Sequence, residues 1–152
     1  MQRRRFLQTA VAAGGTSIAA GSGLLMPGSA LAKQSDPFQA KSVNEVLESL
    51  GATAAEASDK IRIRAPSVAE NGAAVPVGVT STIAGTTEII TITAANPKPL
   101  SARYRFAPGA NPSVESRFKM GKTTTFIAMV KADGKYYTAQ TEIKVTRGGC
   151  GG

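Results

Sequence analysis

The chain has a single cysteine, Cys150, which is the most nucleophilic side chain that its sequence offers. Two glycines stand on each side of it, Gly148 and Gly149 before the sulfur and Gly151 and Gly152 after it. A cysteine thiolate can form a disulfide or take up a sulfane sulfur. Because glycine lacks a Cβ and samples most of φ/ψ space, residues 148–152 are predicted to be flexible. A flexible thiol is typical of a carrier arm with a covalently bound group, not of a preorganised catalytic centre.

The reach of this arm follows from chain geometry. An extended chain advances about 3.3–3.6 Å per residue, so the stretch from Arg147 to Cys150 spans roughly 10 Å. No bulky side chain flanks the sulfur, which could therefore enter a narrow active site of another protein. The alternative is an inert or dimerising thiol on the same tail.

The absence of histidine excludes several enzyme classes. Without an imidazole, the chain has no histidine general base, no Ser-His-Asp triad and no histidine metal ligand. One cysteine cannot form an internal disulfide, a CxxC redox pair or a CxxCH haem-attachment motif. A cysteine-dependent enzyme such as a thiol peroxidase would need an activating or resolving residue beside Cys150, and the glycines supply none. We therefore expect no catalytic residue, no metal and no cofactor.

Residues 1–32 have the three parts of an export signal: a basic head, an apolar middle without acidic residues, and a small-x-small end. In the head, Arg3 and Arg4 are followed by Phe6 and Leu7, which resembles a twin-arginine signal. The glycine-rich, weakly hydrophobic middle fits that route better than the general secretory route, which is the alternative. The same middle is too short for a membrane span, which needs roughly 20 apolar residues.

Cleavage is expected after Ala32, which would release a periplasmic protein without a membrane span. Loss of the three arginines at positions 3–5, with no acidic residue, lowers the formal net charge from +8 to +5. Export removes the protein from nucleic acid, so a nucleic-acid partner is not expected. Twin-arginine export moves folded proteins, and the route therefore favours assembly with a partner subunit before export.

One short helix is predicted over residues 42–50. Ser42 with Glu45 three positions later is typical of a capping box, and Gly51 is a typical helix stop. The apolar residues recur at the spacing of one helical face, namely at Val43, Val46, Leu47 and Leu50.

Seven short strands are predicted after the helix. They are the alternating or β-branched segments 61–64, 73–82, 86–94, 102–106, 114–120, 123–131 and 135–145. Pro76 cannot donate a ladder hydrogen bond, so we expect an edge or a bulge there. Asp133-Gly134 predicts a two-residue hairpin turn. Residues 33–147 are thus predicted to form an all-β domain, an immunoglobulin-like antiparallel β-sandwich.

Taken together, these features resemble the SoxY family, the sulfur-carrier subunits of the bacterial thiosulfate-oxidising Sox system. The resemblance rests on residues 148–152, on the twin-arginine-like leader and on the strand-rich body. Residues 65–72, Ala-Pro-Ser-Val-Ala-Glu-Asn-Gly, and the following Val75-Pro76-Val77 are also similar, although we interpret the first stretch only as a turn between two strands. The resemblance implies that Cys150 carries the intermediates of thiosulfate and sulfur oxidation as covalent adducts.

The resemblance also implies partners. The chain would form a heterodimer with a SoxZ-like sandwich subunit. A haem c enzyme would couple thiosulfate to the cysteine, a hydrolase would release sulfate, and in some organisms a sulfane dehydrogenase would oxidise the remaining sulfur. The carrier itself would not be an enzyme.

Two other functions are consistent with parts of the sequence. A ubiquitin-like sulfur carrier also has a Gly-Gly pair like Gly151-Gly152, but it requires cytoplasmic ATP and a β-grasp fold. A periplasmic binding or structural sandwich module could use Cys150 for a mixed disulfide with a partner. Such a module would keep its binding function after Cys150→Ser, whereas a sulfur carrier would lose every adduct.

Overall fold

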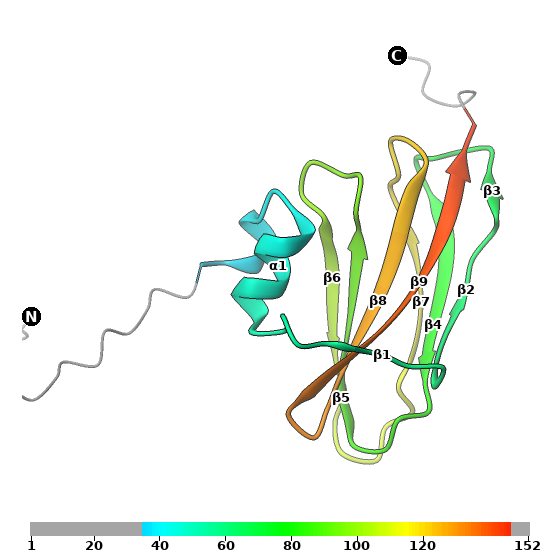
Figure 1. Ribbon diagram of the computed structural model, residues 1–152. Coiled ribbons are helices and arrows are strands. Elements are labelled where there is room, and N and C mark those ends of the chain that lie inside the picture. Colours follow the sequence, from blue (N-terminus) through cyan, green and yellow to red (C-terminus); the bar gives the residue numbers. More distant parts are fainter. Residues whose placement is uncertain (1–34, 147–152) are drawn as a thin grey trace, which may run out of the picture. The chain divides into compact units, whose positions relative to one another are not determined.

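The computed structural model describes residues 35–146, which belong to one compact unit. Within this range no helix combines the length and the apolar content needed to cross a membrane. Figure 1 shows the elements, which in chain order are η1 (Pro37–Gln39), α1 (Val43–Leu50), β1 (Glu56–Ala57), β2 (Ile61–Arg64), β3 (Val68–Ala69), β4 (Val75–Ser81), β5 (Thr86–Thr93), β6 (Leu100–Arg105), β7 (Ser113–Phe118), β8 (Thr124–Ala132) and β9 (Lys135–Val145).

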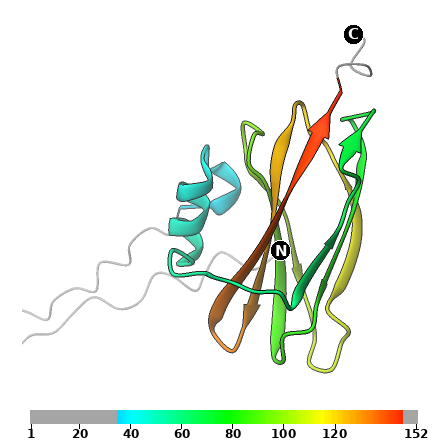
Figure 2. The same ribbon diagram turned by 45° about the vertical axis from the view of Figure 1, so that its right-hand side comes forward.

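The nine strands of the described range form two sheets. The larger sheet has the order β1-β9-β8-β5-β6, with β3 also paired to β9, and the smaller has the order β2-β4-β7. Figures 1 and 2 show the smaller sheet facing one side of the larger sheet, with α1 on the other side. The immunoglobulin-like β-sandwich predicted from the sequence is confirmed, and each of the seven predicted strands is present.

The main core lies between the two sheets. Alternating residues of β4 supply one side of it and alternating residues of β8 supply the other, as expected for strands with one face inward. Phe118 and Phe126 pack against each other across the gap, with ring centroids 5.2 Å apart and ring planes tilted by 56°. The buried members of this core are Ile61, Ala69, Val75, Val77, Val79, Ile89, Phe118, Met120, Phe126, Ala128, Val130 and Ile143.

A second core lies between α1 and the outer face of the larger sheet. Val46 of α1 is fully buried there against Ile92 and Met129 of the sheet. Strand β5 contributes to both cores, because Ile89 points between the sheets while Ile90 points toward α1. This explains why β5 is a nearly continuous β-branched run and not an alternating one.

The helix begins and ends where the sequence predicts. Ser42 Oγ accepts a hydrogen bond from the Glu45 amide at 3.2 Å. The Glu45 carboxylate accepts from the Lys41 amide at 2.8 Å, one residue before the position that a standard capping box uses. Gly51 ends the helix in the left-handed region, with φ of 66°. Local capping therefore determines both limits of α1.

Two strands were not predicted, and both pair in parallel with β9. Strand β1 pairs with Tyr137 and Thr138 near the start of β9, and β3 pairs with Lys144 and Val145 at its end. Between them the chain crosses to the smaller sheet as β2 and then returns. A two-residue strand has no periodicity to recognise, and its partner is distant in sequence, so neither strand could be inferred from local pattern. The antiparallel prediction holds for the seven longer strands only.

Pro76 lies where β4 has a neighbour on one side only. Strand β4 is the central strand of its sheet, but β2 pairs only with residues 78–81 of it. The pairing with β2 therefore does not extend to Pro76. At Pro76 the remaining partner is Arg117 of β7. The missing amide of proline therefore falls where no ladder bond to β2 exists, which explains how a central strand accommodates it.

The predicted hairpin at Asp133-Gly134 is confirmed. Asp133 has φ of 48° and Gly134 has φ of 75°, the pair of positive angles that a type I′ turn requires. The turn joins Ala132 to its register partner Lys135 and so sets the pairing of β8 with β9. The start of β9 is thus fixed by two adjacent residues.

Candidate functional site

The predicted sulfur-binding segment, Gly148–Gly152 with Cys150, lies outside the described residues, as do Arg3, Arg4, Phe6 and Leu7 of the predicted export signal. These assignments stay predictions. The structure describes the part of the sandwich from which the segment continues. Strand β9 ends at Val145, and Thr146 is the last described residue.

The end of β9 is held on one side by β3. The Lys144 amide donates to the Ser67 carbonyl at 3.0 Å, and the Thr146 amide donates to the Ala69 carbonyl at 3.1 Å. Between these bonds, Val68 is the register partner of Lys144. Figure 2 shows the short β3 arrow beside the last part of β9. These bonds continue the ladder of β9 to Thr146, one residue past the end of the strand.

The other side of the same residues is held by the loop between β7 and β8. The Val145 amide donates to Thr123 Oγ1 at 3.1 Å. The Met120 amide donates to the Gly72 carbonyl at 2.7 Å, which joins this loop to the segment that contains β3. A Cβ placed on Gly72 would collide with the Met120 carbonyl oxygen and would lie 2.8 Å from Cγ1 of Val145. Only glycine fits at position 72 without a shift of the backbone.

We name these residues the β9 anchor. It consists of Ser67, Val68, Ala69, Gly72, Met120 and Thr123, and it surrounds residues 144–146. The anchor provides backbone or hydroxyl acceptors for three consecutive amides of the chain. It contains no nucleophile other than hydroxyl groups and no general base. What the anchor does is hold the backbone of residues 144–146 in place.

The charge differs between the two ends of the sandwich. The loops at the anchor end are residues 65–74, 94–99 and 119–123, and their charged residues are Glu70, Lys98, Lys119 and Lys122. The loops at the opposite end are residues 58–60, 82–85, 106–112 and 133–134, and their charged residues are Asp59, Lys60 and Asp133. Cations therefore predominate at the anchor end, which favours anionic ligands weakly and in a salt-dependent way.

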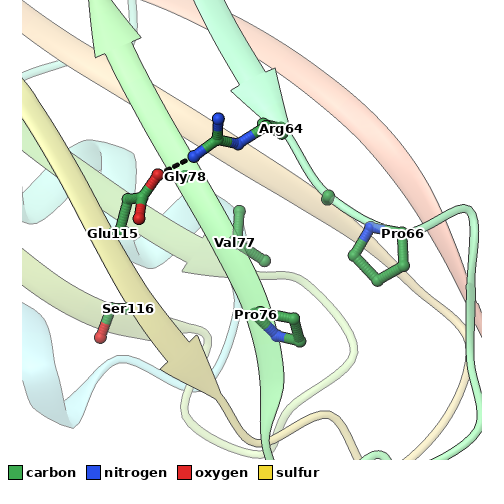
Figure 3. A pocket seen from close by; sticks show the side chains of 8 residues that line it. Arg64, Pro66, Pro76, Val77, Gly78, Glu115 and Ser116 are labelled. Atoms are coloured by element: carbon green, nitrogen blue, oxygen red, sulfur yellow. Dashed lines mark ion pairs between the residues drawn. The ribbon is translucent and has the colours of Figure 1, made fainter.

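A shallow cavity of about 230 Å³ opens on the smaller sheet (Figure 3). Arg64 and Glu115 form an ion pair across β4, directly over Gly78, which is the register partner of both. Their side chains are 78% and 67% exposed, so water screens the pair. The lining residues are Arg64, Ala65, Pro66, Pro76, Val77, Gly78, Glu115 and Ser116. The only carboxylate is already paired with Arg64, so the cavity lacks a free general base for Ser116.

A second ion pair is buried in the larger sheet. Glu88 is 5% exposed, and it accepts from Nε of Arg103 at 2.7 Å and from a terminal nitrogen of the same guanidinium at 3.1 Å. Arg105 lies 3.8 Å from the same carboxylate. The hydrogen bonds to Glu88 raise the pKa of Arg103, and partial burial opposes this. Both carboxylate oxygens of Glu88 accept hydrogen bonds from Arg103, so the pair joins β5 to β6 and offers no free acid or base for catalysis.

Within residues 35–146, no cluster of three His, Cys, Asp or Glu could hold a metal ion.

Comparison with known proteins identifies the family. Residues 46–150 match the family model described as "Sulfur oxidation protein SoxY", and the matched range ends at Cys150. The chain belongs to the SoxY family. A solved structure of the sulfur carrier protein SoxY from Chlorobium limicola f thiosulfatophilum is 40% identical to it, with a TM-score of 0.62. The alignment covers 68% of this chain and 94% of that chain. The SoxY family assigns the chain a sulfur-carrier role in sulfur oxidation.

Other matches add nothing to this assignment. A structure titled "Structural basis of T cell specificity and activation by the bacterial superantigen toxic shock syndrome toxin-1" is 12% identical, with a TM-score of 0.41. It covers 57% of this chain and 98% of that chain, and a likeness at this level supports no conclusion. No curated protein matches the chain in sequence.

In this SoxY-family chain, sequence reasoning missed the anchor. Residues 65–72 were interpreted as a turn, but only the stretch after Ala69 turns, where Asn71 Oδ1 accepts from the Ala73 amide at 2.9 Å. The preceding Val68–Ala69 form β3. Met120 and Thr123 were predicted as terminal residues of strands 114–120 and 123–131, but both lie in the loop between β7 and β8. No local signal could have found them, because the partner of Thr123 is the amide of Val145 and the partner of Met120 is the carbonyl of Gly72.

Proposed function

We propose that this chain is a periplasmic carrier that binds sulfur intermediates covalently on Cys150 and presents them to partner enzymes during thiosulfate and sulfur oxidation. The observation that carries the proposal is the match to the SoxY family model, which extends to Cys150, the only thiol in the chain. The paired glycines on either side leave the sulfur sterically accessible. The export signal predicted over residues 1–32 supports the periplasmic location.

The proposed chemistry begins with oxidative coupling of thiosulfate. A bond forms between the Cys150 thiolate sulfur and the sulfane sulfur of thiosulfate, and two electrons pass to a haem c partner enzyme. Water then attacks the terminal sulfone in a hydrolase. The bond between the two thiosulfate-derived sulfurs breaks, sulfate and two protons leave, and a persulfide stays on Cys150. In hosts that contain a sulfane dehydrogenase, that enzyme oxidises the persulfide sulfur. All of these steps use the active sites of partner proteins.

The proposed quaternary partner is a SoxZ-like β-sandwich subunit, in a heterodimer assembled before export.

The surplus of lysines in the loops at the anchor end is consistent with anionic intermediates, because Lys119 and Lys122 lie in the loop that contacts Val145 through Thr123. The effect on affinity is expected to be small, since these side chains are exposed to screening by salt.

The test is intact-mass spectrometry of the protein purified from cells grown on thiosulfate, before and after reduction. We expect mass additions of sulfur or thiosulfonate that map to the peptide containing Cys150 and are removed by reductant. Cys150→Ser should show none of them and should unfold at the same denaturant concentration as the unsubstituted chain. An unmodified thiol, or only a disulfide to another protein, would instead indicate a binding module that uses a mixed disulfide.

A further inference from the structure

The outer face of the smaller sheet carries arginine side chains that the described part of the protein does not use. Arg62 and Arg64 alternate with core residues on β2, and Arg117 does so on β7, so all three point away from the core. Arg64 pairs with Glu115, whereas neither Arg62 nor Arg117 forms an ion pair with a described residue. Two guanidinium groups are therefore free to bind carboxylates, for which arginine suits better than lysine because it donates two parallel hydrogen bonds.

Gly78 lies at the centre of this face, in the central strand β4, and the described chain gives no reason for a glycine there. Its φ is not positive, and the pairing of β4 with β2 and β7 has no register shift. A Cβ on Gly78 would meet only side-chain atoms of Arg64 and Glu115 at 3.6 Å, an ordinary contact distance. Glycine weakens a strand, and inside a strand it often marks a close approach by a ligand or another backbone. The approaching group is then expected to belong to another molecule.

The cavity beside Gly78 has room for one side chain (Figure 3). It forms because β2 ends at Arg64, which leaves residues 75–77 of β4 without a strand beside them on that side. Its volume of about 230 Å³ is below the roughly 300–1,000 Å³ of small-molecule sites. The apolar part of its lining is Ala65, Pro66, Pro76 and Val77. The cavity therefore suits a single apolar side chain of a partner protein better than a cofactor.

One backbone acceptor beside this cavity has no partner among the described residues. The Thr82 amide donates to the Lys60 carbonyl at 2.9 Å, so by alternation the even-numbered residues of β4 point toward β2. The carbonyl of Pro76 points the same way, beyond the last residue that β2 pairs with, and Pro66 has no amide to donate to it. An extended segment that docks here can supply the missing donor, as in the addition of a strand to the edge of a sheet.

We propose that this face docks an extended acidic segment of a partner protein. One apolar side chain of the segment fills the cavity, its backbone donates to the Pro76 carbonyl, and its carboxylates pair with Arg62 and Arg117. The Cα atoms of these two arginines are separated by roughly 16 Å, from four residues along the strands and two strand spacings across. About five extended residues cover that span. The inference goes beyond the proposed function, because it concerns the sandwich and needs no sulfur on Cys150.

An NMR titration of the isotope-labelled full chain with a defined peptide tests the proposal, with the protein kept reduced so that Cys150 forms no disulfide. The probe is the pentapeptide Asp-Asp-Leu-Asp-Asp with both ends blocked. We expect shifts of the amides around the cavity, at Ala65, Val77, Gly78 and Ser116, and weaker binding as salt is raised. The same peptide with glycine in place of leucine should bind more weakly, and the peptide with lysines in place of the aspartates should cause no shifts.

Gly78→Thr separates docking from stability. The new side chain occupies the space that the partner backbone would use, so peptide affinity should fall at least tenfold. The unfolding free energy should stay the same or rise, because threonine is favoured in strands and glycine is not. A stable Gly78→Thr variant that binds the peptide normally would contradict the role given to Gly78.

Two substitutions with the same change of charge test the arginines. Arg117→Gln should weaken peptide binding about two- to fivefold, the effect of one exposed ion pair. Arg105→Gln is the matched control, because that side chain is 79% exposed on the larger sheet, away from the cavity. Equal losses in the two variants would show that only net charge matters.

Glu115→Gln should have the opposite effect. It removes the carboxylate that pairs with Arg64 and leaves a third guanidinium free for the peptide. We expect peptide binding about two- to fivefold tighter than in the unsubstituted chain. Weaker binding in this variant would contradict the role given to the arginines.

Three results of the titration itself would overturn the inference. The first is the absence of shifts at millimolar peptide, and the second is equal shifts with the acidic and the lysine peptide. The third is a concentration-dependent shift of the same amides without peptide, which would assign the face to contacts between copies of this chain. A lack of mass additions on Cys150 would remove the proposed function and leave the titration result intact.

Discussion

The two ends of β9 are fixed by different kinds of contact. Its start follows a two-residue turn, Asp133-Gly134, whose positive φ angles pair β8 with β9 directly. Its end is held by β3, a strand more than 70 positions earlier in the chain, and by the Thr123 hydroxyl. The local contact makes the hairpin, whereas the distant contacts hold the backbone from Lys144 to Thr146. The proposed chemistry lies beyond the end that depends on distant contacts.

Each end also depends on one glycine from another part of the chain. A Cβ on Gly85 would collide with the carboxylate of Asp133 at the start of β9, and a Cβ on Gly72 would collide with the Met120 carbonyl near its end. A carboxylate can rotate away, but a backbone carbonyl held in the β7–β8 loop cannot. The two ends should therefore differ in their tolerance of a methyl group.

The largest effect is expected from Gly72→Ala. The new methyl group collides with the Met120 carbonyl oxygen and the Val145 side chain, and overpacking of this kind typically costs about 1–3 kcal/mol of unfolding free energy. We expect a value at the upper end of this range, because the nearer atom belongs to the backbone. Urea denaturation followed by circular dichroism measures the loss. Gly121→Ala, in open space, should change the unfolding free energy by less than about 0.5 kcal/mol. Equal stability of the two variants would contradict the packing argument.

A smaller effect is expected from Gly85→Ala. Gly85 has φ of 73°, a conformation that costs an alanine about 1–2 kcal/mol, and the Asp133 carboxylate must also shift. The same denaturation experiment measures this loss. Amide exchange at Lys144 and Thr146 should stay as in the unsubstituted chain, because the change is at the other end of β9. Faster exchange at those two amides would show that the two ends are not independent.

The smallest effect is expected from Tyr136→Phe near the start of β9. The Tyr136 hydroxyl donates to the Leu50 carbonyl at 3.1 Å and so joins β9 to the end of α1. Its removal should lower the unfolding free energy by about 1 kcal/mol, the usual contribution of one such hydrogen bond. Tyr137→Phe is the matched control, since that hydroxyl makes no hydrogen bond to any described residue. Similar losses in both variants would assign the effect to packing and not to the hydrogen bond.

The parts of the fold that sequence could predict are those with local causes. Ser42 and Gly51 determine the limits of α1, and Asp133-Gly134 determines the last hairpin. The sequence did not predict that the two faces of β5 pack against different layers, because Ile89 and Ile90 are indistinguishable as residue types. The assignment of residues to one core or the other depends on where α1 lies.

The candidate site also has one part that the sequence could predict and one part that it could not. Cys150 can be recognised from the sequence, because it is the only cysteine and has two glycines on each side. The anchor residues do not stand out, since each of Ser67, Ala69 and Thr123 is ordinary in its own stretch of sequence. Two of them act through backbone carbonyls, which are the same for every residue type. Only the pairing of distant segments gives these residues a common role.

The two short parallel strands also bear on the solubility of the sandwich. An eleven-residue strand with an open edge invites pairing with other chains, and natural proteins cover or charge such edges. Here β1 and β3 cover the outer edge of β9 at its two ends. The remaining edge strands are β2, β6 and β7. They are charged instead, with alternating arginines in β2 and β6 and with Glu115 and Arg117 in β7. The contacts that hold the end of β9 therefore also protect the folded protein against edge-to-edge aggregation.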